Sequence, residues 1–358
     1  MPDSTLYHPV TIGTGDSVLR LQGNLFLAPV AGYSDRAFRS VCVSGGADFC
    51  YTEMVSSEAL SRGNIKTEDL MRRAPAEKAY AVQIFGGNPD TMAQAARIVL
   101  EKTTAECIDI NGGCPVPKII KTQAGSALTR DPEHLYDIVR AVTDAVQSYT
   151  GPRPHYADGT AAPQHVPVTI KIRTGWDAAH ITWKQAATRA LDAGAAAITL
   201  HGRTRAQGYE GKADWNILKE LVSFVRPSVP VFGSGDVFTP EAAKDMLEQT
   251  GCAGVMFARG AMGHPFIFRQ TRQLLTEGSY GAIPEQERIR AGFDELALLV
   301  QDHGEESACR EMRKRFCAYS KGIAGGAELR RNIISCNTVE DYKAVFAGLS
   351  DLPAGGSL

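Results

Sequence analysis

The sequence lacks several features that would place it in a specialised class of protein. It has no run of about 18 apolar residues, the length that a membrane-spanning helix needs, so we expect no membrane partner. Residues 1–15 show no basic segment followed by an apolar one, so we expect no secretory signal. Lys plus Arg number 38 and Asp plus Glu number 40, so no overall basic excess demands a nucleic-acid partner, although a local patch is enough to bind one.

The cysteines also lack a pattern. All eight are scattered, and no two form a CxxC pair. We therefore expect neither a disulfide scaffold nor a metal site, and a reducing, cytoplasmic environment fits best. Most of these cysteines are expected to be small core residues or inert surface thiols. Cys114 is the exception that the following motifs single out.

A regular alternation of apolar runs and amphipathic stretches predicts the fold. The chain has 358 residues, enough for one large α/β barrel and an additional unit. The apolar runs are rich in Val, Ile and Phe and show little alternation, as is typical of strands buried on both faces. Strands are predicted at Asn24–Val30, Ala47–Met54, Ala79–Gly86, Glu106–Gly112, Pro167–Gly175, Ala196–Arg203, Pro230–Val237 and Gly254–Gly260. Helices are predicted at Asp90–Lys102, Pro132–Gln147, Thr182–Ala193, Asp214–Phe224 and Pro240–Gln249. Eight β/α repeats in about 255 residues predict a TIM (β/α)8 barrel, an α/β fold.

The rest of the chain departs from this repeat. Residues 151–165 are polar and rich in proline, and we interpret them as a surface insertion without a catalytic part. After Gly278 no convincing strand appears, and helices are predicted at Glu285–Gly304, Glu306–Ser320 and Val339–Gly348. We therefore expect a barrel domain at 1–280, a small all-helical domain at 281–350 and a tail at 351–358.

One segment of the helical domain is strongly basic. Between Arg310 and Arg331 there are seven basic residues and two acidic ones. The basic residues are Arg310, Arg313, Lys314, Arg315, Lys321, Arg330 and Arg331. By itself such a run is most simply a solvated helix face, and the alternative is a surface that binds nucleic acid.

The barrel prediction also locates the active site, because barrel enzymes carry it at the carboxyl ends of the strands. The polar residues at those ends are Gln83, Asn111, Cys114, Lys171, Arg173, His201 and Arg203. Gln83, Lys171 and His201 form a set of donors that suits the polar edge of a flavin ring. Lys171 could instead be a Schiff-base lysine of a barrel aldolase.

The last two strand ends suggest a phosphate site. Glycine amides after the seventh and eighth strands bind phosphate in many barrels. Gly233–Gly235 and Ala258–Gly260 have this character, and Arg259 adds a positive charge. Plain barrel turns are the alternative.

Cys114 lies in the sequence NGGCP at the end of the fourth strand. An unperturbed thiol has a pKa of about 8.5, so it is mostly protonated at neutral pH. This property suits a general acid better than a metal ligand. A structural cysteine is the alternative.

These motifs together resemble one family. The motifs follow one another along the chain. They are LAPVAGYSDRAFR from Leu27, VQIFGGNPD from Val82, DINGGCPVPKIIK from Asp109, IKIRTGWD from Ile170, HGRTRAQGYEGKADW from His201, and then GSGD, GVMFARGAMGHPF and SKGIAGGAELR. In this order they resemble the tRNA-dihydrouridine synthases, most closely the bacterial B-type enzymes.

The resemblance implies a flavin-dependent reduction of the C5=C6 bond of tRNA D-loop uridines to dihydrouridine. It implies FMN in the barrel mouth and NADPH, or NADH, as reductant. Hydride would reach C6 of a flipped-out uracil, and Cys114 would protonate C5. The helical domain would bind tRNA. Apart from the resemblance, we expect a monomer by default and a cytoplasmic location from the cysteine pattern.

The resemblance also assigns residues. The residues implied to bind FMN are Pro29, Val30, Ala31, Gln83, Lys171, His201, Ser234, Gly235, Asp236, Ala258 and Arg259. Asn111, Arg173 and Tyr209 match the residues that hold the target uracil. Ala258 stands where the family has glycine, which predicts weaker FMN affinity.

Two further functions compete with this one. A small-molecule flavin dehydrogenase of the dihydroorotate dehydrogenase type would share barrel and flavin, but it would need no basic helical domain. An RNA-binding protein with an inactive barrel is the other, and the presence of Cys114, Lys171 and His201 argues against it.

Overall fold

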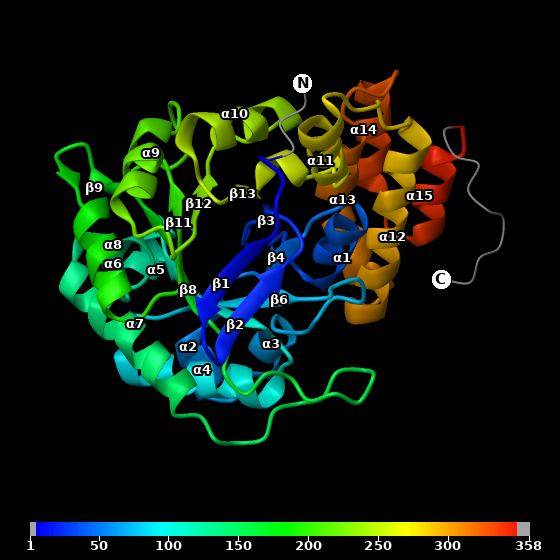
Figure 1. The fold of residues 1–358 in the computed structure, drawn as a ribbon. Coiled ribbons are helices and arrows are strands. Elements are labelled where there is room, and N and C mark those ends of the chain that lie inside the picture. Colours follow the sequence, from blue (N-terminus) through cyan, green and yellow to red (C-terminus); the bar gives the residue numbers. More distant parts are fainter. Residues whose placement is uncertain (1–4, 349–358) are drawn as a thin grey trace.

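The computed structural model describes residues 5–348, and in that part of the chain eight parallel strands close into a barrel (Figure 1). The barrel strands are β3 (Leu25–Leu27), β4 (Phe49–Tyr51), β6 (Tyr80–Phe85), β7 (Cys107–Gly112), β8 (Val168–Arg173), β11 (Ala197–His201), β12 (Val231–Ser234) and β13 (Gly254–Phe257). They pair in the order β4-β3-β13-β12-β11-β8-β7-β6, and a pairing of β4 with β6 closes the ring. The predicted barrel and its predicted strands are therefore confirmed.

Large side chains fill the interior of the barrel. Phe26 of β3 lies edge-to-face against Phe49 of β4 and Phe232 of β12, with ring centroids 6.1 and 5.0 Å apart. Tyr51 and Met256 are buried in the same cluster. Because this core leaves no passage, a ligand can reach the barrel only at its ends.

Helices surround the strands. They are α1 (Arg36–Ser44), α2 (Ser57–Ser61), α3 (Ile65–Asp69), α4 (Pro89–Lys102), α5 (Pro117–Ile120), α6 (Ser126–Arg130), α7 (Pro132–Gln147), α8 (Trp183–Asp192), α9 (Trp215–Phe224), α10 (Pro240–Thr250) and α11 (Ile267–Glu277). Asn88 and Thr239 cap α4 and α10, and a proline occupies the first turn of each. The five predicted barrel helices are confirmed within two residues at each end.

A hairpin that the sequence analysis did not predict closes the amino-terminal end of the barrel. Strands β1 (Val10–Thr14) and β2 (Ser17–Leu21) pair antiparallel. Their inward side chains Ile12, Leu19 and Leu21 join the interior cluster. Shorter unpredicted elements are β5 (Val55–Ser56), β9 (Gly175–Asp177), β10 (His180–Ile181) and the 3-10 turn η1 (Arg259–Ala261).

Residues 151–165 lie at this same end of the barrel. Arg153 donates a hydrogen bond to the carbonyl oxygen of Ala105, and the hydroxyl of Tyr156 donates one to Glu106. Both partners stand just before β7, whereas the active-site ends of the strands are at the other side.

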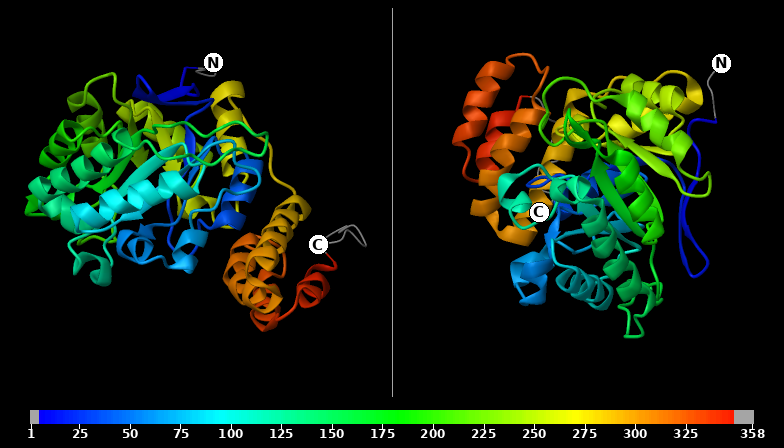
Figure 2. Two further views of the ribbon diagram at one scale, coloured as in Figure 1. Left: turned by 90° about the horizontal axis from the view of Figure 1, so that it is seen from below. Right: turned by 90° about the vertical axis from the view of Figure 1, so that its left-hand side faces the viewer.

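Four helices follow the barrel and form a group beside it (Figure 2). They are α12 (Glu285–His303), α13 (Glu305–Tyr319), α14 (Gly326–Ser335) and α15 (Val339–Phe346). Three of them were predicted, and α14 was not. Their apolar side chains form a cluster of their own, with Phe316 in contact with the rings of Phe293, Tyr342 and Phe346. The tail predicted at 351–358 lies outside the described residues. None of the described helices is long and apolar enough to cross a membrane.

Candidate active site

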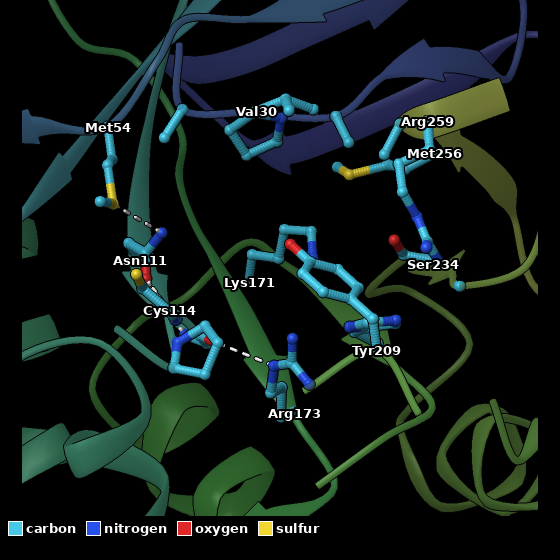
Figure 3. Close-up of a pocket in the computed structure, with 18 of the residues that line it drawn as sticks. Val30, Met54, Asn111, Cys114, Lys171, Arg173, Tyr209, Ser234, Met256 and Arg259 are labelled. Carbon is cyan, nitrogen blue, oxygen red and sulfur yellow. Dashed lines mark hydrogen bonds between the residues drawn. The ribbon is translucent and has the colours of Figure 1, made fainter. Parts of the chain in front are cut away.

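A cavity opens at the carboxyl ends of the barrel strands (Figure 3), and it is lined by every residue that the resemblance assigned to the cofactor, the uracil or catalysis; Arg203, the other strand-end residue, does not line it. These lining residues are Pro29, Val30, Ala31, Gln83, Asn111, Cys114, Lys171, Arg173, His201, Tyr209, Ser234, Gly235, Asp236, Ala258 and Arg259. The cavity is also lined by residues that the sequence analysis did not single out: Ala28, Met54, Gly113, Pro115, Val116, Val237, Phe238 and Met256. The structure thus brings the whole predicted set together, although it does not assign a role to each member.

Asn111 organises the loop that carries Cys114. Its Oδ1 accepts hydrogen bonds from the backbone N–H groups of Gly113, at 3.2 Å, and of Cys114, at 2.9 Å. Its Nδ2 therefore faces the other way and donates to Oε1 of Gln83 at 2.8 Å. Nδ2 also lies 3.7 Å from the sulfur of Met54 (Figure 3), a weak acceptor.

The thiol of Cys114 lies in the cavity between this loop and Arg173. Burial raises its pKa above the ordinary value, and this effect exceeds the opposing influence of Arg173. The thiol is therefore protonated at neutral pH and can give up a proton. No group of three or more His, Cys, Asp or Glu side chains that could hold a metal ion occurs within residues 5–348.

Lys171 and His201 lie on the neighbouring strands β8 and β11. Lys171 lines the cavity, and desolvation together with Arg173 lowers its pKa to about 8. Desolvation and the surrounding cations lower the pKa of His201 to about 2, so its ring is neutral. Because the guanidinium of Arg203 can only donate, Nε2 of His201, 3.4 Å away, is the acceptor and Nδ1 carries the proton.

Arg173 is mostly engaged by the backbone. Its Nε donates to the carbonyl oxygen of Gly113, and one terminal nitrogen donates to those of Thr204 and Gly208, all at 2.9 Å. It thereby joins the Cys114 loop to the loop that carries Tyr209. Tyr209 is 62% exposed at the mouth of the cavity, and the guanidinium of Arg259 lies over its ring, 4.7 Å from the centroid.

The loops after β12 and β13 form a cationic corner. Gly235 has φ of +114°, and a Cβ there would come within 2.6 Å of Cδ2 of His201, so only glycine fits. The carboxylate of Asp236 accepts hydrogen bonds from Arg203, at 2.8 Å, and from the backbone of Ala213, at 2.7 Å. Arg259 lies 3.7 Å from the same carboxylate. Two guanidinium groups against one carboxylate leave this corner with a net positive charge.

Arg203 is the functional residue whose part in this corner the sequence did not reveal. It is 2% exposed and contacts both His201 and Asp236. Its position two residues after His201, at the end of a predicted strand, was the available signal. Its partners are distant in sequence, so only the fold shows them.

Comparison with known proteins gives a consistent result along most of the chain. The family described as Dihydrouridine synthase (Dus) matches residues 26–350. A probable tRNA-dihydrouridine synthase of Treponema pallidum is 54% identical over 347 residues, which are 96% of this chain and 97% of that protein. The tRNA-dihydrouridine synthase B of Pseudomonas putida is 37% identical over 92% of this chain and 91% of its own length.

Solved structures of similar fold share little sequence with the chain. A crystal structure of DHODH in complex with ferulenol, from Eimeria tenella, superposes with a TM-score of 0.52 at 13% identity. The superposition covers 71% of this chain and 81% of the DHODH chain. At this identity the likeness concerns the fold alone.

Proposed function

The chain belongs to the dihydrouridine synthase family, and within that family we propose that it is an FMN enzyme that reduces uridines of the tRNA D-loop with NADPH, or NADH, as reductant. The enzyme is a flavin-dependent oxidoreductase that converts uridine in tRNA to dihydrouridine. The competing small-molecule dehydrogenase is not favoured, because relatives named as tRNA-dihydrouridine synthases align over 96% and 92% of the chain.

The residues of the cavity fit an FMN molecule. Donors from the buried residues Gln83 and neutral His201, and from Lys171, suit the electronegative edge of a flavin ring. The cationic corner at Arg259 suits a phosphate, and Gly235 leaves room for a close approach. We assign the apolar segment Pro29–Ala31 to the face beneath the ring and Ser234, Asp236 and Ala258 to the ribityl and phosphate end. When bound, the flavin would supply the hydride that adds to C6 of uracil.

Cys114 is the observation on which the chemistry rests. Its protonated thiol lies in the cavity, on a loop that Asn111 and Arg173 hold from opposite sides. We propose that this thiol donates the proton to C5 of uracil. The thiolate that remains would lie near the Arg173 guanidinium, which favours the charged form.

The target base is held by the residues around the thiol. Nδ2 of Asn111 has one hydrogen directed only at the sulfur of Met54, so it is available to a uracil carbonyl. The exposed side chain of Tyr209 offers the base its hydroxyl and the part of its ring that Arg259 leaves uncovered. Since Cys114 lies inside the cavity, the uridine must leave its stack to reach the thiol. We propose that the helices at 281–350 bind the tRNA and that the enzyme acts as a cytoplasmic monomer.

The test is a mass analysis of nucleosides from dihydrouridine-free tRNA after incubation with NADPH and the FMN-loaded protein. The wild type should form dihydrouridine, and Cys114→Ala should form about 10²–10⁴ times less. Cys317→Ala is the matched control, because that cysteine is also half-buried but lies on α13, among the helices beside the barrel. Full activity of Cys114→Ala would remove the assigned proton donor.

The same experiment separates the competing functions. If the protein holds FMN and oxidises NADPH but leaves tRNA unchanged, the result would favour a small-molecule dehydrogenase. Protein that binds tRNA but holds no FMN would indicate an inactive barrel.

A further inference from the structure

Asp109 is a buried carboxylate to which the proposed mechanism gives no part. It lies in β7, beside Gln83 of β6 and Thr169 of β8 in the register of the sheet. It is fully buried, and desolvation raises its pKa to about 6. A buried carboxylate is costly unless its oxygens accept hydrogen bonds. Here Oδ2 accepts one from Nε2 of Gln83 and Oδ1 accepts one from the hydroxyl of Thr169, both at 2.6 Å.

These contacts complete a chain of hydrogen bonds that runs to the catalytic loop. From the loop, the N–H of Cys114 donates to Asn111, Asn111 donates to Gln83, and Gln83 donates to Asp109. Taken alone, the side-chain amides of Asn111 and Gln83 could each adopt either of two orientations. The two ends of the chain fix the choice, because the backbone N–H of Cys114 only donates and the carboxylate of Asp109 only accepts.

Asp109 also acts on the charge of Lys171. The ionisable groups that face Lys171 are Asp109 on β7, Arg173 on its own strand and His201 on β11. His201 is neutral, Arg173 is positive, and Asp109 is the anion that favours the protonated amine. Lys171 in turn favours the ionised form of Asp109.

We propose that Asp109 is a positioning residue, which fixes the orientation of the Gln83 and Asn111 amides and keeps Lys171 charged toward a bound flavin. This inference rests on the proposed function, because it takes Gln83 and Lys171 to bind FMN. Asp109 itself touches neither the cavity nor the substrate. It defines which way Gln83 presents its remaining N–H, and it holds the Cys114 loop through Asn111.

The test is FMN binding by the apoprotein, followed by quenching of flavin fluorescence from pH 5 to 9.5. In the wild type, affinity should fall at high pH as Lys171 loses its proton. Asp109→Asn should bind FMN about tenfold more weakly at pH 7, the effect of about one charge-assisted hydrogen bond. Its alkaline loss should also begin about one pH unit lower, because the pKa of Lys171 falls when the neighbouring negative charge is removed.

A matched control is Glu106→Gln, which also converts a buried carboxylate to an amide, but just before β7 at the other end of the barrel. Glu106 contacts Arg73 and Tyr156 and does not face the cavity. The Glu106→Gln substitution should leave both the FMN affinity and the alkaline midpoint unchanged. A general loss of stability would not move the midpoint, so the shift distinguishes positioning from a structural role.

If Asp109→Asn does not fold, Thr169→Val tests the same idea. Loss of the Thr169 donor raises the pKa of Asp109, so the loss of FMN affinity at low pH should begin at higher pH than in the wild type. The FMN phosphate titrates equally in both proteins, so its effect cancels when the pH dependence of the variant is compared with that of the wild type. If the wild type binds FMN and the midpoint is unchanged in either variant, this inference alone is overturned. Wild-type protein that does not bind FMN overturns the proposed function as well.

Discussion

The guanidinium of Arg315 on α13 forms an ion pair with the carboxylate of Asp35, the N-cap residue of α1, 280 positions earlier in the chain. Arg315 also pairs with Glu295 of α12, and its side chain is 1% exposed. The loop before Asp35 carries Pro29–Ala31, which line the cavity. A buried charge cluster therefore joins the helices after the barrel to the strand end that contacts the proposed flavin.

Arg315→Met should destabilise the protein by about 3–5 kcal/mol, because it leaves the fully buried carboxylate of Glu295, and the 14% exposed one of Asp35, without their counter-charge. The measurement is urea denaturation at pH 7. Lys314→Met is the neighbouring control. Lys314 is exposed and donates one hydrogen bond to the carbonyl oxygen of Gly32, so its loss should cost less than about 1 kcal/mol. Equal effects of the two substitutions would contradict the cluster as the source of this stability.

His201 should make the stability fall in mild acid. Its pKa is about 2 in the folded state and about 6.5 when unfolded. The unfolded chain therefore binds the extra proton, and the contribution is complete above pH 6.5 and is lost as the pH falls toward 2. Between pH 7 and pH 5 the wild type should lose about 2 kcal/mol more than His201→Gln. Urea denaturation at the two pH values measures this. His155→Gln, at an exposed position, should behave as the wild type does.

The barrel could be predicted because its strands are buried on both faces. Runs such as Gly254–Phe257 place apolar residues on both sides, with Met256 in the interior and Val255 and Phe257 toward the helices, and this leaves a continuous signal in the sequence. The strand ends then located the cavity. The hairpin Val10–Leu21 was missed although Gly15-Asp16 forms its turn, because two five-residue strands give a weak signal. Helix α14 begins at Gly326 without a side-chain cap, so its start carried no sequence mark.

Contacts between distant residues could not be predicted. The sequence placed Asp109 in a strand, but its bonds to Gln83 and Thr169 depend on strand register. The same holds for Arg203 and its partner Asp236. The charge of the segment Arg310–Arg331 was visible, whereas the partners of its side chains were not.

Ala258→Gly should bind FMN several-fold more tightly. Ala258 lies between β13 and the 3-10 turn at Arg259, and its methyl group lines the phosphate end of the cavity. Removing the methyl lets the backbone approach a phosphate. The dissociation constant from fluorescence quenching measures the effect. Ala261→Gly, a buried position that does not line the cavity, should leave it unchanged. Unaltered affinity in Ala258→Gly would show that the methyl group does not limit binding.

The basic segment of the helical region divides into two groups. Arg310 pairs with Glu306, Arg313 donates to the carbonyl oxygen of Cys336, and Lys314 and Arg315 are engaged as described. Within residues 5–348, no hydrogen bond or ion pair engages the side chains of Lys321, Arg330 and Arg331. Since the side chains of these three have neither a carboxylate nor a carbonyl partner in that part of the chain, they are the expected contacts to tRNA phosphate groups.

Replacing Lys321, Arg330 and Arg331 together by alanine should therefore weaken tRNA binding without unfolding the protein. Each phosphate contact that is lost should reduce the slope of log affinity against log salt by about 1, so the slope of the triple variant should be smaller by about 2–3. Binding measured at several salt concentrations gives the slope. Arg310→Ala is the control, because its charge is already matched by Glu306 within one helix. If net charge alone determines binding, Arg310→Ala removes one charge rather than three and should reduce the slope about a third as much as the triple variant. An unchanged slope in Arg310→Ala indicates that tRNA contacts the α13–α14 turn and the face of α14 that carries Arg330 and Arg331.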